Sequence, residues 1–189
     1  INASIDSVLL PSMAGEQEHR ERVKQMTRRA IKTSTYIMAP LMMGVLFCAK
    51  IVVKLLLTDK WLPSVPYLQI FCFTYMLWPI HTANLNAIKA VGRSDLFLKL
   101  EVIKKIVGMI LLLLTMKISV MAMAYSLIVS GLLGQFINAW PNRKLLDYSY
   151  FEQIRDVIPS VSIALIMGII VYFVGFLPLP TFIVLIIQI

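Results

Sequence analysis

The sequence predicts an all-α membrane protein, a polytopic bundle of transmembrane helices. Of its 189 residues, 59% are hydrophobic and 15% are charged, and the mean hydropathy is +0.80. Soluble domains have roughly 45–50% apolar and about 25% charged residues. The apolar residues form long runs without alternation, which indicates helices and not a transmembrane barrel. Basic residues gather in every second connection, as expected of a chain that crosses a membrane repeatedly.

Five apolar runs meet or approach the length of a membrane-spanning helix, which is roughly 20 residues for a 30 Å hydrocarbon core. These runs cover residues 31–57, 67–88, 96–116, 118–140 and 157–177. Shorter apolar segments stand at 1–12 and 181–189, and nine residues make only about 14 Å of helix. We therefore expect the chain to be a fragment that begins and ends within membrane helices.

Two prolines lie inside the predicted spans, Pro40 in the first and Pro79 in the second. Membrane helices tolerate proline when neighbouring groups satisfy the freed carbonyl. Each proline predicts a hinge or a static bend, and static bending is favoured because proline is common in such helices.

Fourteen of the eighteen Lys and Arg residues fall on one side of the predicted membrane, which the positive-inside rule identifies as cytoplasmic. They are Arg20, Arg22, Lys24, Arg28, Arg29, Lys32, Lys89, Arg93, Lys99, Lys104, Lys105, Arg143, Lys144 and Arg155. The predicted organisation is therefore a helix end (1–12), a basic cytoplasmic loop or helix (13–30), four transmembrane helices (31–140), a cytoplasmic interfacial segment (141–156) and a further helix pair (157–189). In the interfacial segment we expect Leu145, Leu146, Tyr148, Phe151 and Ile154 to face lipid.

Polar side chains within a membrane are costly, so each marks a candidate site. The second span ends in the densest polar run, in which Thr82, Asn86 and Lys89 share a helix face and His81 and Asn84 adjoin it. These groups suit a hydrated cavity that contacts sugar hydroxyls, or hydrogen bonds between helices. Both interpretations remain open, and His81 taken alone is more typical of packing.

The third and fourth spans contribute further candidates. Lys104 and Lys105 lie well inside the third span, where they either snorkel to the headgroups or bind a phosphate or diphosphate from the cytoplasm. In the fourth span, Gln135 and Asn138 are cavity candidates beside a Ser/Gly stripe that favours close packing.

Two acidic residues in the spans are candidate cation sites. Glu101 is spaced to pair with Lys104 or Lys105. Asp6 is the lone acid of the first helix end.

The sequence contains no motif typical of a soluble enzyme. There is no Gly-rich phosphate loop, no Ser–His–acid grouping and no His/Cys cluster with metal spacing. Cys48 and Cys72 both lie in apolar runs, which predicts no disulfide framework. We expect no catalytic residue, no metal and no cofactor. The net charge of +8 indicates basic loops of a membrane protein and not a nucleic-acid binder.

Three segments together resemble a known family. VLLPSMAGEQEHRERVKQMTRRAIK (8–32), LLLTDKWLPSVPYLQI (55–70) and NAIKAVGRSDLFLKLEVIKK (86–105) resemble Wzx-like flippases of lipid-linked oligosaccharides, in the multidrug/oligosaccharidyl-lipid/polysaccharide exporter superfamily. The sequence departs from the family at the turn between the third and fourth predicted spans, where Ser119 and Val120 stand in place of the usual glycine.

The resemblance implies a protein of two six-helix lobes plus an extra helix pair, of which this chain is the second lobe without its first helix, together with that pair. It implies a transporter in the cell (plasma or inner) membrane that moves a polyprenyl-diphosphate-linked oligosaccharide by alternating access. Membrane lipids and polysaccharide assembly proteins are the implied partners. The alternatives are a multidrug or small-molecule exporter of the same superfamily, or a membrane-embedded glycan polymerase or ligase.

Overall fold

The computed structural model describes residues 2–174, with side chains at residue 7 and from residue 9 onward. This part of the chain is helical and contains no strand, so the predicted all-α fold is confirmed. The second helix of the expected terminal pair lies outside the described residues. The elements are α1 (Asn2–Ala14), α2 (Arg20–Leu57), the 3-10 helix η1 (Asp59–Ser64), α3 (Val65–Met76), α4 (Trp78–Ala90), α5 (Ser94–Thr115), α6 (Val120–Leu145) and α7 (Tyr150–Val174).

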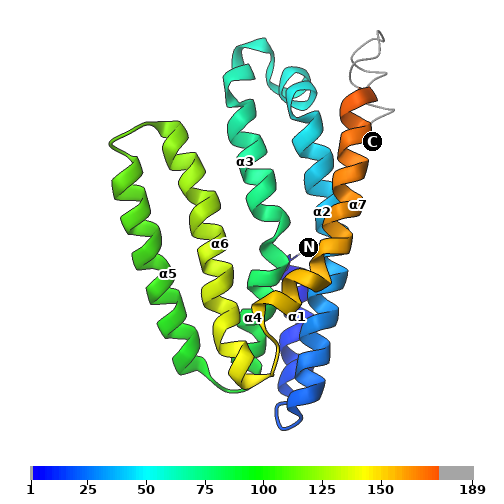
Figure 1. Cartoon of the computed structure of the whole chain (residues 1–189), viewed down its shortest axis with the longest axis vertical. Coiled ribbons are helices and arrows are strands. Elements are labelled where there is room, and N and C mark those ends of the chain that lie inside the picture. The colour runs from blue at the N-terminus through cyan, green and yellow to red at the C-terminus, as the bar shows by residue number, and fades with distance from the viewer. Residues whose placement is uncertain (1, 175–189) are drawn as a thin grey trace.

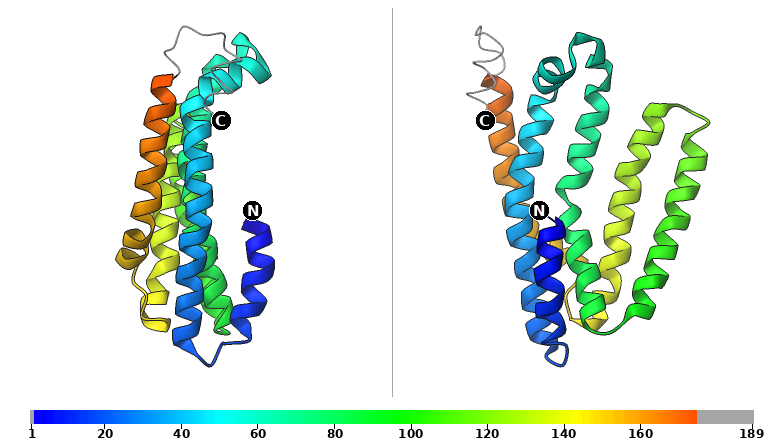
Figure 2. Two further views of the ribbon diagram at one scale, coloured as in Figure 1. Left: turned by 90° about the vertical axis from the view of Figure 1, so that its right-hand side faces the viewer. Right: turned by 180° about the vertical axis from the view of Figure 1, so that it is seen from behind.

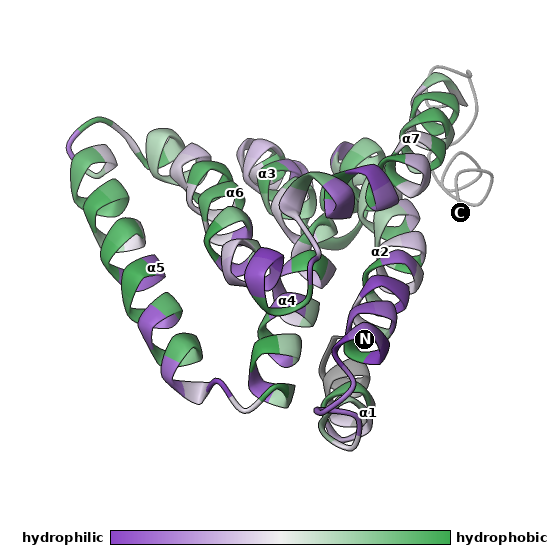
Figure 3. Ribbon diagram, turned by 60° about the horizontal axis from the view of Figure 1, so that its bottom comes forward, coloured by the Kyte–Doolittle hydropathy of each residue, from purple (hydrophilic) through white to green (hydrophobic). Residues whose placement is uncertain are grey.

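The helices run up and down between two ends of the molecule (Figure 1). At the lower end of Figure 1, which we call the basic end, α1 leads into α2, α4 into α5, and α6 into α7. The opposite end holds η1 and the α5–α6 turn. Hydrophilic residues colour the start of α2, the start of α7 and the lower half of α5 (Figure 3). The connections predicted to be cytoplasmic from their basic residues therefore lie together at one end of the fold.

Three described helices are long and apolar enough to cross a membrane, namely α2, α6 and α7. The second predicted span is instead broken at Leu77 into α3 and α4. Pro79 explains the break, because proline lacks an N–H and its ring clashes with the carbonyl four residues earlier. By contrast, α2 continues unbroken through Pro40.

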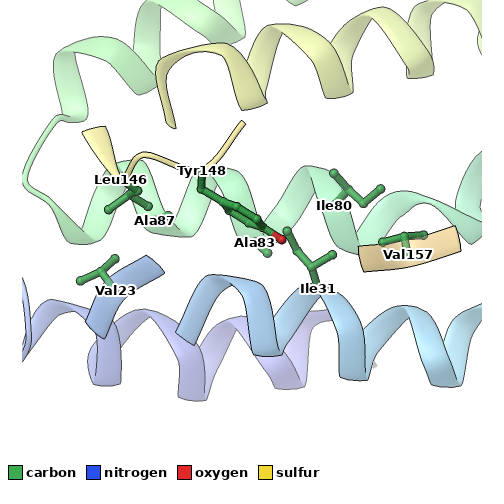
Figure 4. Close-up of a cluster of buried hydrophobic side chains, with 8 residues drawn as sticks. All are labelled: Val23, Ile31, Ile80, Ala83, Ala87, Leu146, Tyr148 and Val157. Atoms are coloured by element: carbon green, nitrogen blue, oxygen red, sulfur yellow. The ribbon is translucent and has the colours of Figure 1, made fainter. Parts of the chain in front are cut away.

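The buried core lies where α2, α4 and α7 meet near the basic end, and a smaller cluster joins α2, α3 and α7. Figure 4 shows the larger cluster: Val23, Ile31, Ile80, Ala83, Ala87, Leu146, Tyr148 and Val157. Tyr148 and Leu146 are only 1% and 3% exposed, so our expectation that they face lipid was wrong. They follow the end of α6 in a connection that turns inward onto α2 and α4 (Figure 4).

The α5–α6 hairpin stands apart from this core, as the view from behind shows (Figure 2). Leu100 is the one buried residue of α5. The hairpin instead packs helix on helix within itself, and α6 in turn packs on α3 and α4. The described chain therefore has a packed core around α2, α4 and α7 on one side and the α5–α6 hairpin on the other.

Candidate functional site

A cavity of about 330 Å³ lies between the α3–α4 pair and the α5–α6 hairpin. This volume is at the lower end of the roughly 300–1,000 Å³ of ligand pockets. Its lining combines aromatic rings, charged groups and small residues: Phe71, Thr74, Tyr75, Trp78, His81, Glu101, Lys104, Lys105, Gly108, Leu127, Ser130, Gly131, Gly134 and Gln135. Five of the residues that the sequence indicates thus line one cavity: His81, Glu101, Lys104, Lys105 and Gln135.

The charged side of the cavity is built by α5. Lys104 Nζ donates to Glu101 Oε1 one helical turn away, which confirms the pairing that their spacing predicts. Lys104 is largely enclosed, with 12% of its side chain exposed, whereas Lys105 is exposed. At 1.5 Å per residue, Lys104 lies about 15 Å along the helix from Ser94. A cationic group therefore projects deep into the span, next to open space.

His81 connects this charged side to α4 and α6. Its Nε2 lies 3.5 Å from Lys104 Nζ, and its Nδ1 lies 2.7 Å from Nδ2 of Asn138. The ring also stacks on Trp78 with centroids 4.8 Å apart. These contacts hold the imidazole in one orientation at the wall of the cavity. His81 is thus both a packing residue and a cavity residue.

Small residues on α6 leave room for the cavity. A Cβ on Gly131 would lie 3.2 Å from Thr74, and one on Gly134 would lie 3.6 Å from the Lys104 stem. Close helix packing, predicted by the Ser/Gly stripe, therefore occurs here. The buried Oε1 of Gln135 has no hydrogen-bond partner, which leaves an acceptor at the cavity wall.

Five other indicated polar residues do not line this cavity: Thr82, Asn84, Asn86, Lys89 and Asn138. Thr82 bonds to carbonyls of its own helix, and Lys89 lies 4.2 Å above the Phe97 ring. Asn84 and Asn86 are buried. The side chain of Asp6 lies outside the described residues.

Asn84 belongs to a buried amide network that joins three helices. Asn84 Nδ2 donates to Gln153 Oε1 at 2.6 Å, and Gln153 Nε2 donates back to Asn84 Oδ1 at 3.0 Å. Asn142 Nδ2 donates to the same Oδ1 at 2.6 Å. Interhelical bonding, one of the two interpretations of the polar run, therefore describes Asn84.

An ionic cluster beside this network joins α2 to α7. Arg28 holds Asp156 through two bonds, Nε to Oδ2 at 2.6 Å and Nη2 to Oδ1 at 2.7 Å. Lys32 Nζ lies 3.0 Å from Oδ1, and the Tyr148 hydroxyl donates to Oδ2 at 3.0 Å. Burial alone raises the pKa of Asp156, but the hydrogen bonds from Arg28, Lys32 and Tyr148 outweigh burial and hold this pKa below its usual value.

We call these seven residues the polar tie: Arg28, Lys32, Asn84, Asn142, Tyr148, Gln153 and Asp156. The sequence indicates Asn84 as a candidate and counts Arg28 and Lys32 among the cytoplasmic bases, but it does not indicate their partners. No local signal marks them, because Arg28 and Asp156 are 128 positions apart.

Residues 1–66 match the model of a family described as "Polysaccharide biosynthesis protein". The chain is 26% identical over 182 residues to an uncharacterized membrane protein in the cps region of Klebsiella pneumoniae, covering 95% of this chain and 35% of that protein. It is 26% identical over 184 residues to the lipopolysaccharide biosynthesis protein WzxC of Escherichia coli (strain K12), covering 97% of this chain and 35% of that protein.

Among solved structures, the chain is similar to the lipid II flippase MurJ in an inward closed conformation. The TM-score is 0.78 at 16% sequence identity, covering 99% of this chain and 40% of that one. The fold is therefore shared. With the sequence matches, this confirms the resemblance to polysaccharide-type flippases and shows a multi-pass membrane protein. The chain spans about a third of the length of its curated relatives.

Proposed function

We propose that this chain is part of a transporter, a flippase that moves a polyprenyl-diphosphate-linked oligosaccharide across the cytoplasmic membrane. The relatives named for polysaccharide and lipopolysaccharide biosynthesis support this substrate class. The single observation that carries the proposal is the pair Lys104 and Lys105 at the wall of the cavity. A diphosphate is the anionic part of such a glycolipid, and lysine is a good point-charge partner for phosphate.

The position of the lysines favours a role in ligand binding over a role only in setting the orientation of the helix in the membrane. An ionisable group within a membrane segment is costly and usually faces a cavity or a partner. Lys104 has both, because it lines the cavity and pairs with Glu101. The two lysines and one glutamate give the lining a net charge of +1 before His81 is counted. That excess favours an anionic substrate over the cationic compounds of many small-molecule exporters.

The fold suits alternating access. Transporters of this kind move packed bundles of helices against one another around a site near the middle of the membrane. Here the site lies between α5, which has one buried residue, and the α3–α4 pair, whereas α2, α4 and α7 are bound together at the basic end. The break between α3 and α4 at Leu77 adjoins the cavity and supplies a point where the wall can bend.

The test is complementation of a flippase-null strain by the gene product that contains this chain. We expect Lys104→Gln combined with Lys105→Gln to reduce surface glycan by about tenfold or more, since hydrogen bonds to charged groups contribute about 1.5–3 kcal/mol. Lys99→Gln is the matched control, because Lys99 is an exposed base of the same helix that does not line the cavity. Full surface glycan in the double variant, at equal protein level in the membrane, would contradict the proposal.

A further inference from the structure

Four aromatic rings follow one another along the α3–α4 wall of the cavity, and we call them the aromatic ladder: Phe71, Tyr75, Trp78 and His81. Successive ring centroids are 6.5, 5.3 and 4.8 Å apart. The ladder crosses the break at Leu77 without interruption. It extends over ten steps from residue to residue, about 15 Å along the helix axes. This length exceeds what an aromatic anchor at one membrane–water boundary requires.

The orientation of the rings separates the ladder from ordinary packing. Its successive interplanar angles are 34°, 37° and 32°. Elsewhere, Phe47–Tyr172 and Phe136–Tyr150 meet edge to face at 63° and 86°, so that the edge of one ring covers the face of another. Phe71 and Tyr75 also remain 43% and 45% exposed. Stacking at 5.3 and 4.8 Å covers part of the Trp78 faces, so the accessible ring surface of the ladder is supplied mainly by Phe71 and Tyr75, which both line the cavity.

The α5–α6 side of the cavity includes four small residues. Gly108 comes from α5, and Ser130, Gly131 and Gly134 come from α6. A Cβ on Gly108 would meet nothing within 4 Å. The cavity therefore has aromatic rings on its α3–α4 side and small residues among those on its α5–α6 side.

We propose that the aromatic ladder binds the sugar rings of the substrate, while Lys104 and Lys105 bind its diphosphate. This inference rests on the proposed function and assigns a separate part of the glycolipid to each wall. The face of a sugar ring carries C–H groups with partial positive charge, which complement the negative face of an aromatic ring. Stacking also removes apolar surface from water on both partners.

Gln135 is the independent observation that favours a sugar over a lipid tail. Its side chain is 4% exposed, and its buried Oε1 has no partner. An unpaired buried acceptor costs free energy until a donor reaches it. Sugar hydroxyls are donors, whereas a polyprenyl chain has none.

The test uses two soluble probes on the purified complete gene product, each carrying one half of the polar substrate. One is inorganic pyrophosphate, whose binding is measured by isothermal titration calorimetry. The other is the lipid-free repeat-unit oligosaccharide of the source strain, whose binding is followed by saturation-transfer NMR. We expect Trp78→Leu and Tyr75→Leu to weaken oligosaccharide binding by about three- to tenfold and to leave pyrophosphate binding unchanged. Trp78→Tyr, which keeps an aromatic face, should retain most of the binding and guards against a loss caused by misfolding.

Trp140→Leu is the matched control, because Trp140 on α6 packs on Phe136 and does not line the cavity. Oligosaccharide binding that is absent in the wild type, unchanged in Trp78→Leu and Tyr75→Leu, or equally reduced in Trp140→Leu would overturn the inference. The proposed function fails differently: the wild type would not bind pyrophosphate, or surface glycan would not depend on Lys104 and Lys105. The two failures are therefore distinguishable.

Discussion

The polar tie and the cavity contain similar residue types, but the side chains of the tie bond across helices, and its one unpaired buried oxygen, Asn142 Oδ1, does not line the cavity. In the tie, one arginine, one lysine and one tyrosine surround Asp156, and the Asn84 and Gln153 amides bond reciprocally. In the cavity, the Gln135 oxygen has no partner, and Lys105 is exposed. Polar groups that bond across helices fasten these helices together, whereas an unpaired group is available to a ligand only where it borders a cavity, as Gln135 does.

The two regions also differ in what surrounds them. The tie adjoins the larger hydrophobic cluster. Its amide side chains are buried, so the loss of one amide leaves the others without a partner and without water. The cavity adjoins α5, of which only Leu100 is buried among the described residues. We therefore expect substitutions in the tie to lower stability first and substitutions in the cavity to lower transport first. The predictions below test this division, from the largest expected change in stability to the smallest.

The largest loss of stability is expected for Asp156→Ala, which leaves Arg28 and Lys32 without their shared carboxylate. Removing one partner of a buried ion pair costs about 3–5 kcal/mol. Arg28 and Lys32 are about half exposed (50% and 48%), so solvent screening reduces this to about 2–3 kcal/mol. Thermal unfolding of the purified protein in detergent measures the effect. Asp147→Asn is the control, since the Asp147 side chain is fully exposed and asparagine, like aspartate, tolerates its left-handed backbone (φ 51°); an equal loss in both variants would refute the special role of Asp156.

A smaller loss is expected for Asn84→Ala. The substitution leaves the amides of Gln153 and Asn142 without their shared acceptor, and each unsatisfied buried group costs about 1–3 kcal/mol. The two neighbours can still bond to one another or to backbone, so we expect a total near 2 kcal/mol. Thr82→Ala serves as the control, because the Thr82 hydroxyl bonds only to carbonyls of its own helix in the described structure. Stability equal to wild type would show that the network is dispensable.

The fold class was predictable because it depends on quantities summed over many residues. Long apolar runs, and bases in alternate connections, are visible without any tertiary contact. The break at Leu77 was less accessible, because Pro40 and Pro79 stand in similar apolar contexts and only Pro79 divides a span. Which proline a helix tolerates depends on the neighbours that satisfy the freed carbonyl, and these neighbours come from other helices.

The sequence predicted the candidate site only as a set of polar residues that are energetically unfavourable within a membrane span. Periodicity along one helix placed Thr82, Asn86 and Lys89 on a shared face, but the cavity is formed by residues from α3, α4, α5 and α6. Asn84 and Gln135 looked alike as amides within spans. Their roles separated only through their partners, since Asn84 meets Gln153 across 69 positions and the Gln135 oxygen meets none.

Acid should weaken the tie through Asp156. A carboxyl whose pKa is lower in the folded state stabilises the fold above its unfolded pKa, about 3.9, and loses that contribution as the pH falls through the folded value. The difference in unfolding temperature between wild type and Asp156→Asn should therefore be constant from neutral pH to about pH 5 and shrink below about pH 4. A difference that already shrinks near pH 6 would contradict this assignment. For the exposed Asp147, the corresponding Asn variant should match wild type throughout.

The smallest change in stability, and the sharpest test of the division, is expected for Glu101→Gln. Its pair with Lys104 borders the cavity, with 30% and 12% of the two side chains accessible, and the glutamine keeps an oxygen that can accept from Lys104, so we expect a loss of about 1 kcal/mol. In the cavity, however, the Glu101 carboxylate competes with an anionic ligand for the same ammonium group. We therefore expect inorganic pyrophosphate to bind the variant up to about fivefold more tightly, with only a small fall in unfolding temperature. Glu21→Gln, at an exposed acid of α2 far from the cavity lining, should change neither quantity. Weaker pyrophosphate binding in Glu101→Gln would mean that Glu101 positions Lys104 for the ligand, and the cavity would then depend on internal pairing as the tie does.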